Sequence, residues 1–201
     1  MARRPPSLAN AMQHWKRLST RDIIRDRFVQ LRADRCETGT GQILDPYYVL
    51  EQPEWVHVLA FDEEDRVLLV RQYRYAADVF GFELPGGAAD PGEDLLTAAR
   101  RELLEETGCT AENWRHVAAP CANSARQNNR VHCFIADHAR IVAPQHLDHG
   151  EEIAFEFVSV PDLLELVRRG EVSQSMHIAL IHLALEHLNR LALVAAPRIV
   201  D

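Results

Sequence analysis

Cysteine is scarce in this chain, and the cysteines that are present form no recognisable pattern. They are widely separated and include no CxxC pair, so their spacing supports neither a zinc knuckle nor a disulfide framework. We therefore expect reduced thiols that are mostly buried. The four residues are Cys36, Cys109, Cys121 and Cys133.

Long apolar runs are also missing from the sequence. No stretch approaches the apolar length that a helix needs to span a bilayer, and the N-terminal residues lack the unbroken apolar segment of a secretory signal. We therefore expect a cytoplasmic protein with no membrane partner.

Basic residues are the scarcer kind of charge, with 22 Lys and Arg against 30 Asp and Glu, for a formal net charge of -8. A nucleic-acid surface requires clustered Lys and Arg, so this balance argues against a nucleic-acid partner. An anionic small molecule would instead have to be bound through a metal ion. The length of 201 residues suits one well-filled domain with a small annex.

The order of apolar and turn-forming segments predicts two parts, residues 1–49 and residues 50–201. Residues 1 to about 20 are polar and are expected to form a loose arm or a short helix. Between residues 22 and 49, short apolar runs separated by glycine-containing and proline-containing turns predict two or three strands. Such a small sheet buries little by itself, so we expect it to pack on the main domain or on a second subunit.

The second part alternates between strand-like and helix-like segments, which predicts a mixed sheet covered by helices and hence an α/β fold. Residues 55–61 and 66–72 are expected to form a β-hairpin around a charged turn. Further strands are expected at 114–119, 130–136 and 153–160, and helices at 161–169 and 176–193.

One stretch, ELPGGAADPGEDLLTAARRELLEETGC at residues 83–109, combines glycines with closely spaced carboxylates. Its fixed positions follow the spacing G-x5-E-x7-R-E-x-x-E-E-x-G. These positions are Gly87, Glu93, Arg101, Glu102, Glu105, Glu106 and Gly108.

The acidic part of this stretch is expected to be a helix over about residues 91–107. Asp90 is predicted as the N-cap, Glu93 as its capping-box partner and Gly108 as the left-handed residue at the end. Three of its glutamates fall within an arc of about 100° and repel one another, so a positive charge should compensate them. These residues are Glu102, Glu105 and Glu106. The alternative is an acidic helix face exposed to solvent.

The loop before the helix favours a metal site over a solvated face. Gly86 and Gly87 have no side chains, so their backbone can approach an ion and direct carbonyl oxygens at it. Hard oxygen ligands suit Mg²⁺ or Mn²⁺, which bridge to substrate phosphates and provide a water that attacks phosphorus. Arg101 could hold a glutamate in place by a charged hydrogen bond, or it could form a surface salt bridge.

This spacing resembles the Nudix box of the Nudix hydrolases at every fixed position. The segments VLLVRQYR, FELPGG and AARRELLEETG are similar to the branch of ADP-ribose pyrophosphatases and related nucleoside-diphosphate-sugar hydrolases. The resemblance implies an α/β/α Nudix sandwich with a mixed sheet and a small N-terminal β-rich subdomain. It also implies a homodimer, in which the N-terminal sheet contributes to the partner's substrate site.

The resemblance further assigns roles to individual residues. The metal ligands would be Glu102, Glu105, Glu106 and the carbonyl of Gly86, with Gly87, Glu93 and Arg101 supporting them and Glu105 and Arg101 counted among the catalytic residues. A loop glutamate acts as general base in related enzymes, and Glu151 or Glu152 stands in that position here, unless the pair is only a polar entry to a strand.

Substrate recognition must come from outside the box. Arg71 and Arg74 either face the phosphate or ribose of the substrate or pair with nearby carboxylates. Trp55 is a core residue or a cover for a nucleobase. The Ser-Pro-Gly element usual in ADP-ribose hydrolases is absent at 123–126, and Arg126, together with Asn128, Asn129 and Arg130, contacts the substrate or forms a solvated loop.

The resemblance thus predicts a Mg²⁺-dependent enzyme that splits the pyrophosphate of a nucleotide-derived small molecule, ADP-ribose or a related nucleotide sugar. Two alternatives stay open. One is a Nudix pyrophosphohydrolase acting on RNA 5′ ends, dinucleoside polyphosphates or oxidised nucleotides. The other is a non-catalytic sensor of ADP-ribose-like ligands, although such regulators usually have a degraded box and this box is whole.

Overall fold

The computed structural model describes residues 13–191, which divide into two compact units that we describe separately. The smaller unit extends to Gln52 and also contains Asn123–Asn129, whereas the larger unit contains Pro53–Ala122 and the chain from Arg130 onward. The boundary predicted after residue 49 therefore stays a prediction, and the structure adds a distant segment to the first part.

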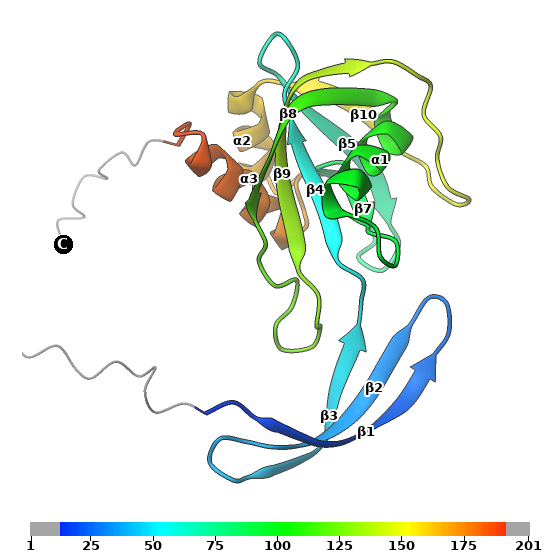
Figure 1. Cartoon of the computed structure of the whole chain (residues 1–201). Helices are drawn as coiled ribbons and strands as arrows, with labels where there is room; N and C mark the ends of the chain where they lie inside the picture. The colour runs from blue at the N-terminus through cyan, green and yellow to red at the C-terminus, as the bar shows by residue number, and fades with distance from the viewer. Residues whose placement is uncertain (1–12, 192–201) are drawn as a thin grey trace, which may run out of the picture. The chain divides into compact units, whose positions relative to one another are not determined.

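The smaller unit is an antiparallel sheet with the strand order β1-β2-β3 (Figure 1). Its strands are β1 (Lys16–Arg25), β2 (Gln30–Glu37) and β3 (Ile43–Glu51). The segment Asn123–Asn129 joins this unit through the backbone, because the Leu50 amide donates to the Arg126 carbonyl at 2.8 Å.

The expectation of a loose arm or short helix up to residue 20 is wrong from Lys16 onward, and its first twelve residues lie outside the described part of the chain. Residues Lys16–Arg25 pair with β2, in a register that runs from Lys16 opposite Glu37 to Arg25 opposite Gln30. The polar composition misled the prediction because every residue of β1 is exposed, so this strand gives no buried apolar pattern.

The larger unit contains two sheets. The four-stranded sheet has the order β7-β4-β9-β8, with β4 and β9 parallel and the other neighbours antiparallel. The three-stranded antiparallel sheet has the order β10-β5-β6. The strands are β4 (Trp55–Ala60), β5 (Val67–Arg74), β6 (Val79–Glu83), β7 (Gly86–Ala88), β8 (Cys109–Ala118), β9 (Val131–Ile141) and β10 (Ala154–Val158).

The predicted β-hairpin of residues 55–72 is wrong, because β4 and β5 belong to different sheets. Only an antiparallel bridge between Phe61 and Val67 connects them directly. Residues 56–60 are all buried, which shows that both faces of β4 are covered. A strand covered on both faces belongs in the interior of a sheet, and β4 accordingly pairs with β7 and β9.

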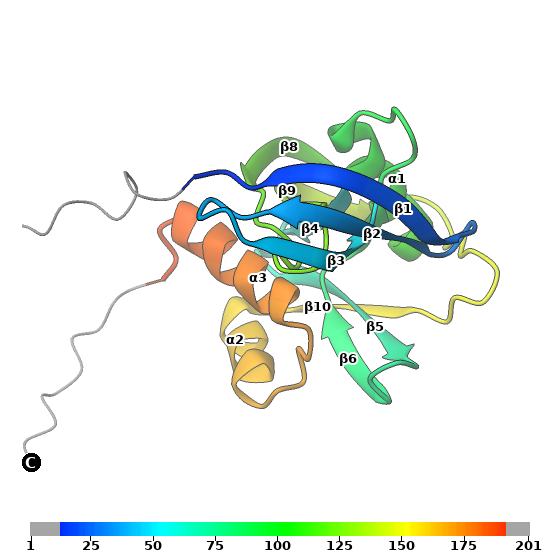
Figure 2. The same ribbon diagram turned by 90° about the horizontal axis from the view of Figure 1, so that it is seen from below.

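The helices are α1 (Leu95–Thr107), α2 (Val160–Arg168) and α3 (Ser175–His187), and they lie on two sides of the sheets (Figures 1 and 2). On one side, Ala98, Ala99 and Leu103 of α1 pack against Val56 and Val58 of β4. On the other side, Leu163 of α2 and Leu180, Ile181, Ala184 and Leu185 of α3 pack with Leu59 and Ile135. This arrangement confirms the α/β/α sandwich with a mixed sheet and a β-rich N-terminal part.

Cys36, Cys109 and Cys133 are buried and Cys121 is exposed, which agrees with the expectation that the thiols are mostly buried. None of the helices within residues 13–191 has the length and apolar character that crossing a lipid bilayer requires.

Candidate active site

Helix α1 carries the clustered carboxylates, and it begins four residues later than the sequence predicted. Its N-cap is Asp94, whose side chain accepts a hydrogen bond from the Thr97 amide at 3.0 Å. The predicted cap at Asp90 is wrong because Gly92 takes a positive φ of 81°, which interrupts any helix before Leu95. The predicted end is confirmed, since Gly108 is left-handed with φ 67°.

Arg101 supplies the positive charge that the acidic helix requires. Its guanidinium donates to Glu102 at 2.8 Å and to Glu105 at 3.0 Å. It also forms two hydrogen bonds to Glu93, at 3.0 and 2.9 Å, so the turn before the helix is tied to the helix itself. The hydrogen bonds that Arg101 donates, first to Glu93 and then to Glu102 and Glu105, raise its pKa above the usual value.

Glu106 lies deepest among the three glutamates, with 5% of its surface exposed. One carboxylate oxygen accepts a hydrogen bond from the Gly86 amide at 2.8 Å. Burial raises the pKa of Glu106 to about 8, the charges of Glu102 and Glu151 act in the same direction, and the Gly86 amide opposes them. Burial also raises the pKa of Glu102. Because the pKa of Glu106 is about 8, binding of a divalent cation to Glu106 near neutral pH would displace a proton from its carboxyl.

The backbone of the glycine loop, Gly86 and Gly87, lies very close to strand β4 and to the Glu102 side chain. A Cβ atom on Gly86 would lie 2.0 Å from the Val56 carbonyl oxygen, and one on Gly87 would lie 2.7 Å from a carboxylate oxygen of Glu102. Gly86 therefore excludes any side chain, whereas a side chain at Gly87 would have to displace the carboxylate of Glu102. The glycine backbone thus lies against Glu102 and Glu106.

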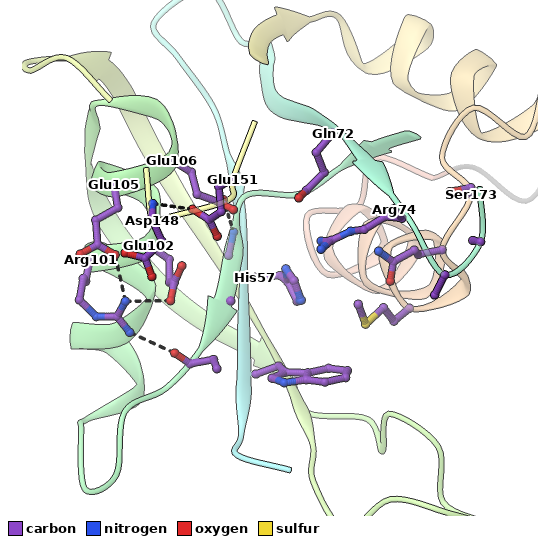
Figure 3. A pocket seen from close by; sticks show the side chains of 18 of the residues that line it. His57, Gln72, Arg74, Arg101, Glu102, Glu105, Glu106, Asp148, Glu151 and Ser173 are labelled. Carbon is purple, nitrogen blue, oxygen red and sulfur yellow. Dashed lines mark hydrogen bonds and ion pairs between the residues drawn. The ribbon is translucent and has the colours of Figure 1, made fainter. Parts of the chain in front are cut away.

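The donor atoms gathered here are carboxylate and carbonyl oxygens, which fit Mg²⁺ or Mn²⁺. Among residues 13–191, however, no three carboxylate, imidazole or thiolate groups converge in a geometry ready to hold a metal ion. Figure 3 shows the reason, since Glu102 and Glu105 are directed at Arg101 and Glu106 is held by the backbone of the glycine loop. Binding an ion would require these side chains to turn away from their present partners.

A pocket of about 920 Å³ opens beside the carboxylates. One wall is acidic, with Glu102, Glu105, Glu106, Asp148 and Glu151. The opposite wall comes from the start of β4, from β5, the turn after it and the first residue of β6, and from residues 173–176 at the beginning of α3. It is formed by Trp55, His57, Gln72, Arg74, Ala76, Ala77, Val79, Ser173, Gln174 and Met176.

Most of the predicted site residues line this one pocket. Those that do are Trp55, Arg74, Gly86, Gly87, Arg101, Glu102, Glu105, Glu106 and Glu151. Glu93 supports the pocket from behind through Arg101. Arg71 and Glu152 line a second pocket, to which Glu151 also contributes, and the Arg71 guanidinium lies 5.4 Å from the centre of the Phe82 ring. Arg126 belongs to the smaller unit.

Sequence reasoning missed a buried polar group behind the second wall. Glu83, only 1% exposed, accepts hydrogen bonds from Arg74, Gln174 and His177. Beside it, the rings of His57 and His177 meet edge to face, with centroids 4.6 Å apart and an angle of 76° between the ring planes. The available signal was a single polar residue inside an otherwise apolar strand, Glu83 in FGFEL and His57 in WVHVLA.

Comparisons with known proteins agree with this geometry. The family described as NUDIX domain matches residues 52–177, and the family described as nucleoside diphosphate sugar hydrolase N-terminal domain matches residues 15–50. A crystal structure of an ADP compounds hydrolase superposes with a TM-score of 0.77 at 19% identity, covering 90% of this chain and 98% of that one, which shows the likeness of fold.

Two relatives cover most of the chain. The ADP-ribose pyrophosphatase of Bacillus subtilis is 28% identical over 158 residues, which are 78% of this chain and 85% of the relative. The CMP-5'-(N-acetyl-N-hydroxy-3-aminopropyl)phosphonate hydrolase of Streptomyces rubellomurinus is 28% identical over 162 residues, which are 80% of this chain and 77% of the relative.

Proposed function

Because the chain belongs to the NUDIX domain family and is a pyrophosphohydrolase, we propose that it hydrolyses the pyrophosphate bond of a nucleoside diphosphate linked to a second group, with Mg²⁺ or Mn²⁺ as cofactor. The substrate class we propose is ADP-ribose or a related nucleotide sugar, cleaved to AMP and ribose 5-phosphate in the case of ADP-ribose. One observation carries the proposal: the same pocket joins the glutamates of α1 to Arg74 and Trp55, so it offers groups for a metal, a phosphate and a nucleobase.

We assign the residues of the acidic wall different roles in this reaction. Glu102, Glu105, Glu106 and the Gly86 carbonyl would hold the cation, which when bound supplies positive charge to stabilise the phosphoryl oxygens in the transition state. Arg101 orients Glu102 and Glu105 through hydrogen bonds of 2.8 and 3.0 Å.

The attacking water must lose its proton to a base. Glu151 lines the main pocket beside Glu106, and Glu152 lines the second pocket, so we propose Glu151 as the first choice of general base and Glu152 as the second. On the opposite wall, Arg74 would contact a substrate phosphate or the ribose, and Trp55 would cover the nucleobase. Arg71 and Arg126 remain proposed substrate contacts.

We further propose a cytoplasmic homodimer in which the smaller unit forms part of the interface. All residues of β1 are exposed, and Leu18, Ile23 and Ile24 on this strand present apolar side chains to solvent. An edge strand with exposed apolar residues is suited to pairing with another chain. Light scattering coupled to size exclusion would detect the dimer, and Ile23→Lys should convert it to a monomer.

The function is tested by measuring phosphate release, with added phosphatase, from a panel of nucleoside-diphosphate sugars with and without Mg²⁺. The panel includes a dinucleoside polyphosphate, and also RNA with a 5′-triphosphate and an oxidised nucleotide, which together represent the other pyrophosphohydrolases. The last two are assayed without phosphatase, by release of phosphate or pyrophosphate, because phosphatase would itself remove their terminal phosphates. Glu105→Gln and Glu106→Gln should each abolish most of the turnover. Full turnover in both variants, or binding of ADP-ribose without cleavage of any compound, would contradict the proposal, and the second result would identify a sensor.

A further inference from the structure

Glu83 is a buried carboxylate that is not among the proposed metal ligands, and its hydrogen-bond partners Arg74 and Gln174 line the pocket. It is the last residue of β6, with 1% of its side chain exposed. One oxygen accepts from Arg74 Nε at 2.8 Å and from Gln174 Nε2 at 2.7 Å. The other accepts from Arg74 Nη2 at 2.6 Å and from His177 Nε2 at 3.1 Å. Four donors therefore converge on one carboxylate.

A carboxylate can only accept hydrogen bonds, so Glu83 fixes the orientation of each partner. Gln174 must present its amide nitrogen to Glu83, which leaves its carbonyl oxygen free. His177 must carry its proton on Nε2. Its Nδ1 then has a lone pair, and it accepts from the Leu84 amide at 3.2 Å, which agrees with this assignment.

The same reasoning fixes the proton of His57. Its Nδ1 lies 3.4 Å from the Leu84 carbonyl oxygen, an acceptor, so the proton is on Nδ1 and Nε2 has a lone pair. The two polar atoms of the Leu84 backbone are thus divided between the two histidines, the amide facing His177 and the carbonyl facing His57. Because Leu84 follows Glu83 directly, the carboxylate and both imidazoles form one connected arrangement.

Three atoms of this arrangement have no hydrogen-bond partner within the described part of the chain: Nη1 of Arg74, Oε1 of Gln174 and Nε2 of His57. All three residues line the pocket. Figure 3 shows the His57 ring and the Arg74 guanidinium on the side of the pocket away from the glutamates of α1. This wall therefore offers one cationic donor beside two neutral acceptors.

We propose that Glu83 is a positioning residue that sets this donor and acceptor pattern, and that the pattern selects a substrate group with a phosphate next to hydroxyl groups, a phosphorylated sugar. The proposal rests on the proposed function and deepens it. The Arg74 donor suits an anionic phosphate oxygen, whereas Gln174 Oε1 and His57 Nε2 suit hydroxyl hydrogens. A substrate portion that lacks hydroxyl groups would leave both acceptors without partners, and unpaired polar groups in a binding site reduce affinity.

Replacing Glu83 by glutamine reverses the pattern with almost no change in size. A carboxamide has one acceptor oxygen and one donor nitrogen, so it cannot accept from all four donors. The donors that face its nitrogen lose their partner. Gln174 can regain a hydrogen bond only by turning its own carbonyl oxygen toward the new carboxamide nitrogen at position 83 and its nitrogen toward the pocket. The acceptor on the pocket wall is then replaced by a donor.

The experiment measures KM and kcat of Glu83→Gln with ADP-ribose and with an ADP-linked deoxysugar that lacks hydroxyl groups on the distal sugar. We expect KM for ADP-ribose to rise about tenfold, the equivalent of one hydrogen bond, with a much smaller change in kcat. The preference for ADP-ribose over the deoxysugar should shrink by a similar factor. An unchanged preference would overturn the proposal.

Two further variants separate positioning from a loss of folding. Gln174→Leu removes the pocket acceptor and leaves the ion pair of Glu83 and Arg74, and it should lower the same preference. The double variant Glu83→Gln with Gln174→Glu returns one carboxylate to the cluster and an acceptor to the pocket, so it should recover much of the affinity for ADP-ribose. Failure of both effects would contradict the proposal even if Glu83→Gln does not fold.

The matched control is Glu54→Gln, which also removes a carboxylate from a histidine, since Glu54 lies 3.1 Å from His132 Nε2 and neither residue lines the pocket. This variant should retain the sugar preference. Nitrogen-15 NMR of the imidazoles gives a readout that needs no turnover, because Glu83→Gln should change the Nδ1 and Nε2 signals of His177. Unchanged signals would refute the positioning role, whereas changed signals in an enzyme that cleaves no nucleotide sugar would refute only the proposed function.

Discussion

The buried carboxyl of Glu106 should make the metal-free protein less stable as the pH rises. Its pKa is about 8 in the folded protein against 4.5 in a solvated glutamate, so its contribution to stability is complete below pH 4.5 and is lost as the pH rises toward 8. For these two values, linkage gives a small part of this loss by pH 5.5 and most of it by pH 8.5. The difference of about 3 kcal/mol corresponds to roughly 6 to 12 °C in Tm for a chain of this size.

The assay compares thermal unfolding of the unaltered protein and of Glu106→Gln in EDTA at pH 5.5 and pH 8.5. The amide side chain of glutamine does not titrate, and its carbonyl can still accept from the Gly86 amide. Glu106→Gln should therefore lose less stability across this range, by about 3 kcal/mol. The matched control Glu105→Gln should follow the unaltered protein because it retains Glu106.

Addition of Mg²⁺ at pH 8.5 tests whether a cation that binds at the Glu106 carboxyl restores the stability lost at this pH. The cation should replace the proton and raise the Tm of the unaltered protein, whereas Glu106→Gln should gain much less. Parallel stability profiles of the unaltered protein and Glu106→Gln between the two pH values would refute the reasoning, since they would show that Glu106 ionises in the fold without cost.

Three further predictions concern the loop and the helix. Gly87→Ala should reduce kcat strongly with a native circular dichroism spectrum, because a Cβ atom there would lie 2.7 Å from Glu102 and displace it; unchanged kcat would show that Glu102 tolerates the shift. Asp94→Ala should cost about 1 kcal/mol in urea denaturation by removing the N-cap, and more than Asp90→Ala, which leaves that cap in place; equal costs would contradict the observed helix start. Leu103→Ala should cost about 2 to 5 kcal/mol in the same assay because Leu103 is fully buried, and a cost below about 1 kcal/mol would show that the core can close around the missing side chain.

Local patterns in the sequence predicted a mixed sheet covered by helices and most of the acidic wall, and the resemblance to the Nudix hydrolases added the α/β/α arrangement. The spacing of Arg101, Glu102, Glu105 and Glu106 places them on one side of a helix whatever the rest of the chain does, and Gly108 ends that helix through its own backbone preference. These features need no knowledge of distant contacts.

Features that depend on distant contacts could not be predicted in this way. The separation of β4 and β5 into two sheets follows from pairing with β9, more than 70 residues away in sequence, for instance Trp55 with Val131. The start of α1 was misplaced because Asp90 and Asp94 both have suitable residues around them, and only the conformation of Gly92 decides between them.

The second wall of the pocket was hidden for the same reason. Arg74 was recognised only as a cation with two alternative roles, and the structure shows it paired with Glu83 while it also lines the pocket. Gln174 and His177 lie about 90 residues from Glu83 and carry no motif, so no local pattern joins them to it. Their meeting is a product of the packing of α3 on the sheets.

The division of the larger unit into two sheets has a consequence for how such an enzyme can change. The glutamates lie on α1 and the glycine loop includes β7, a strand of the four-stranded sheet, whereas Arg74 and Glu83 lie on the three-stranded sheet. Substitutions on β5, on β6 and in the turn between them can therefore alter the second wall while the residues of the acidic wall stay the same. Evolution can therefore change which substrates bind through single substitutions in the second wall, while the glutamates of α1 and the glycine loop are retained.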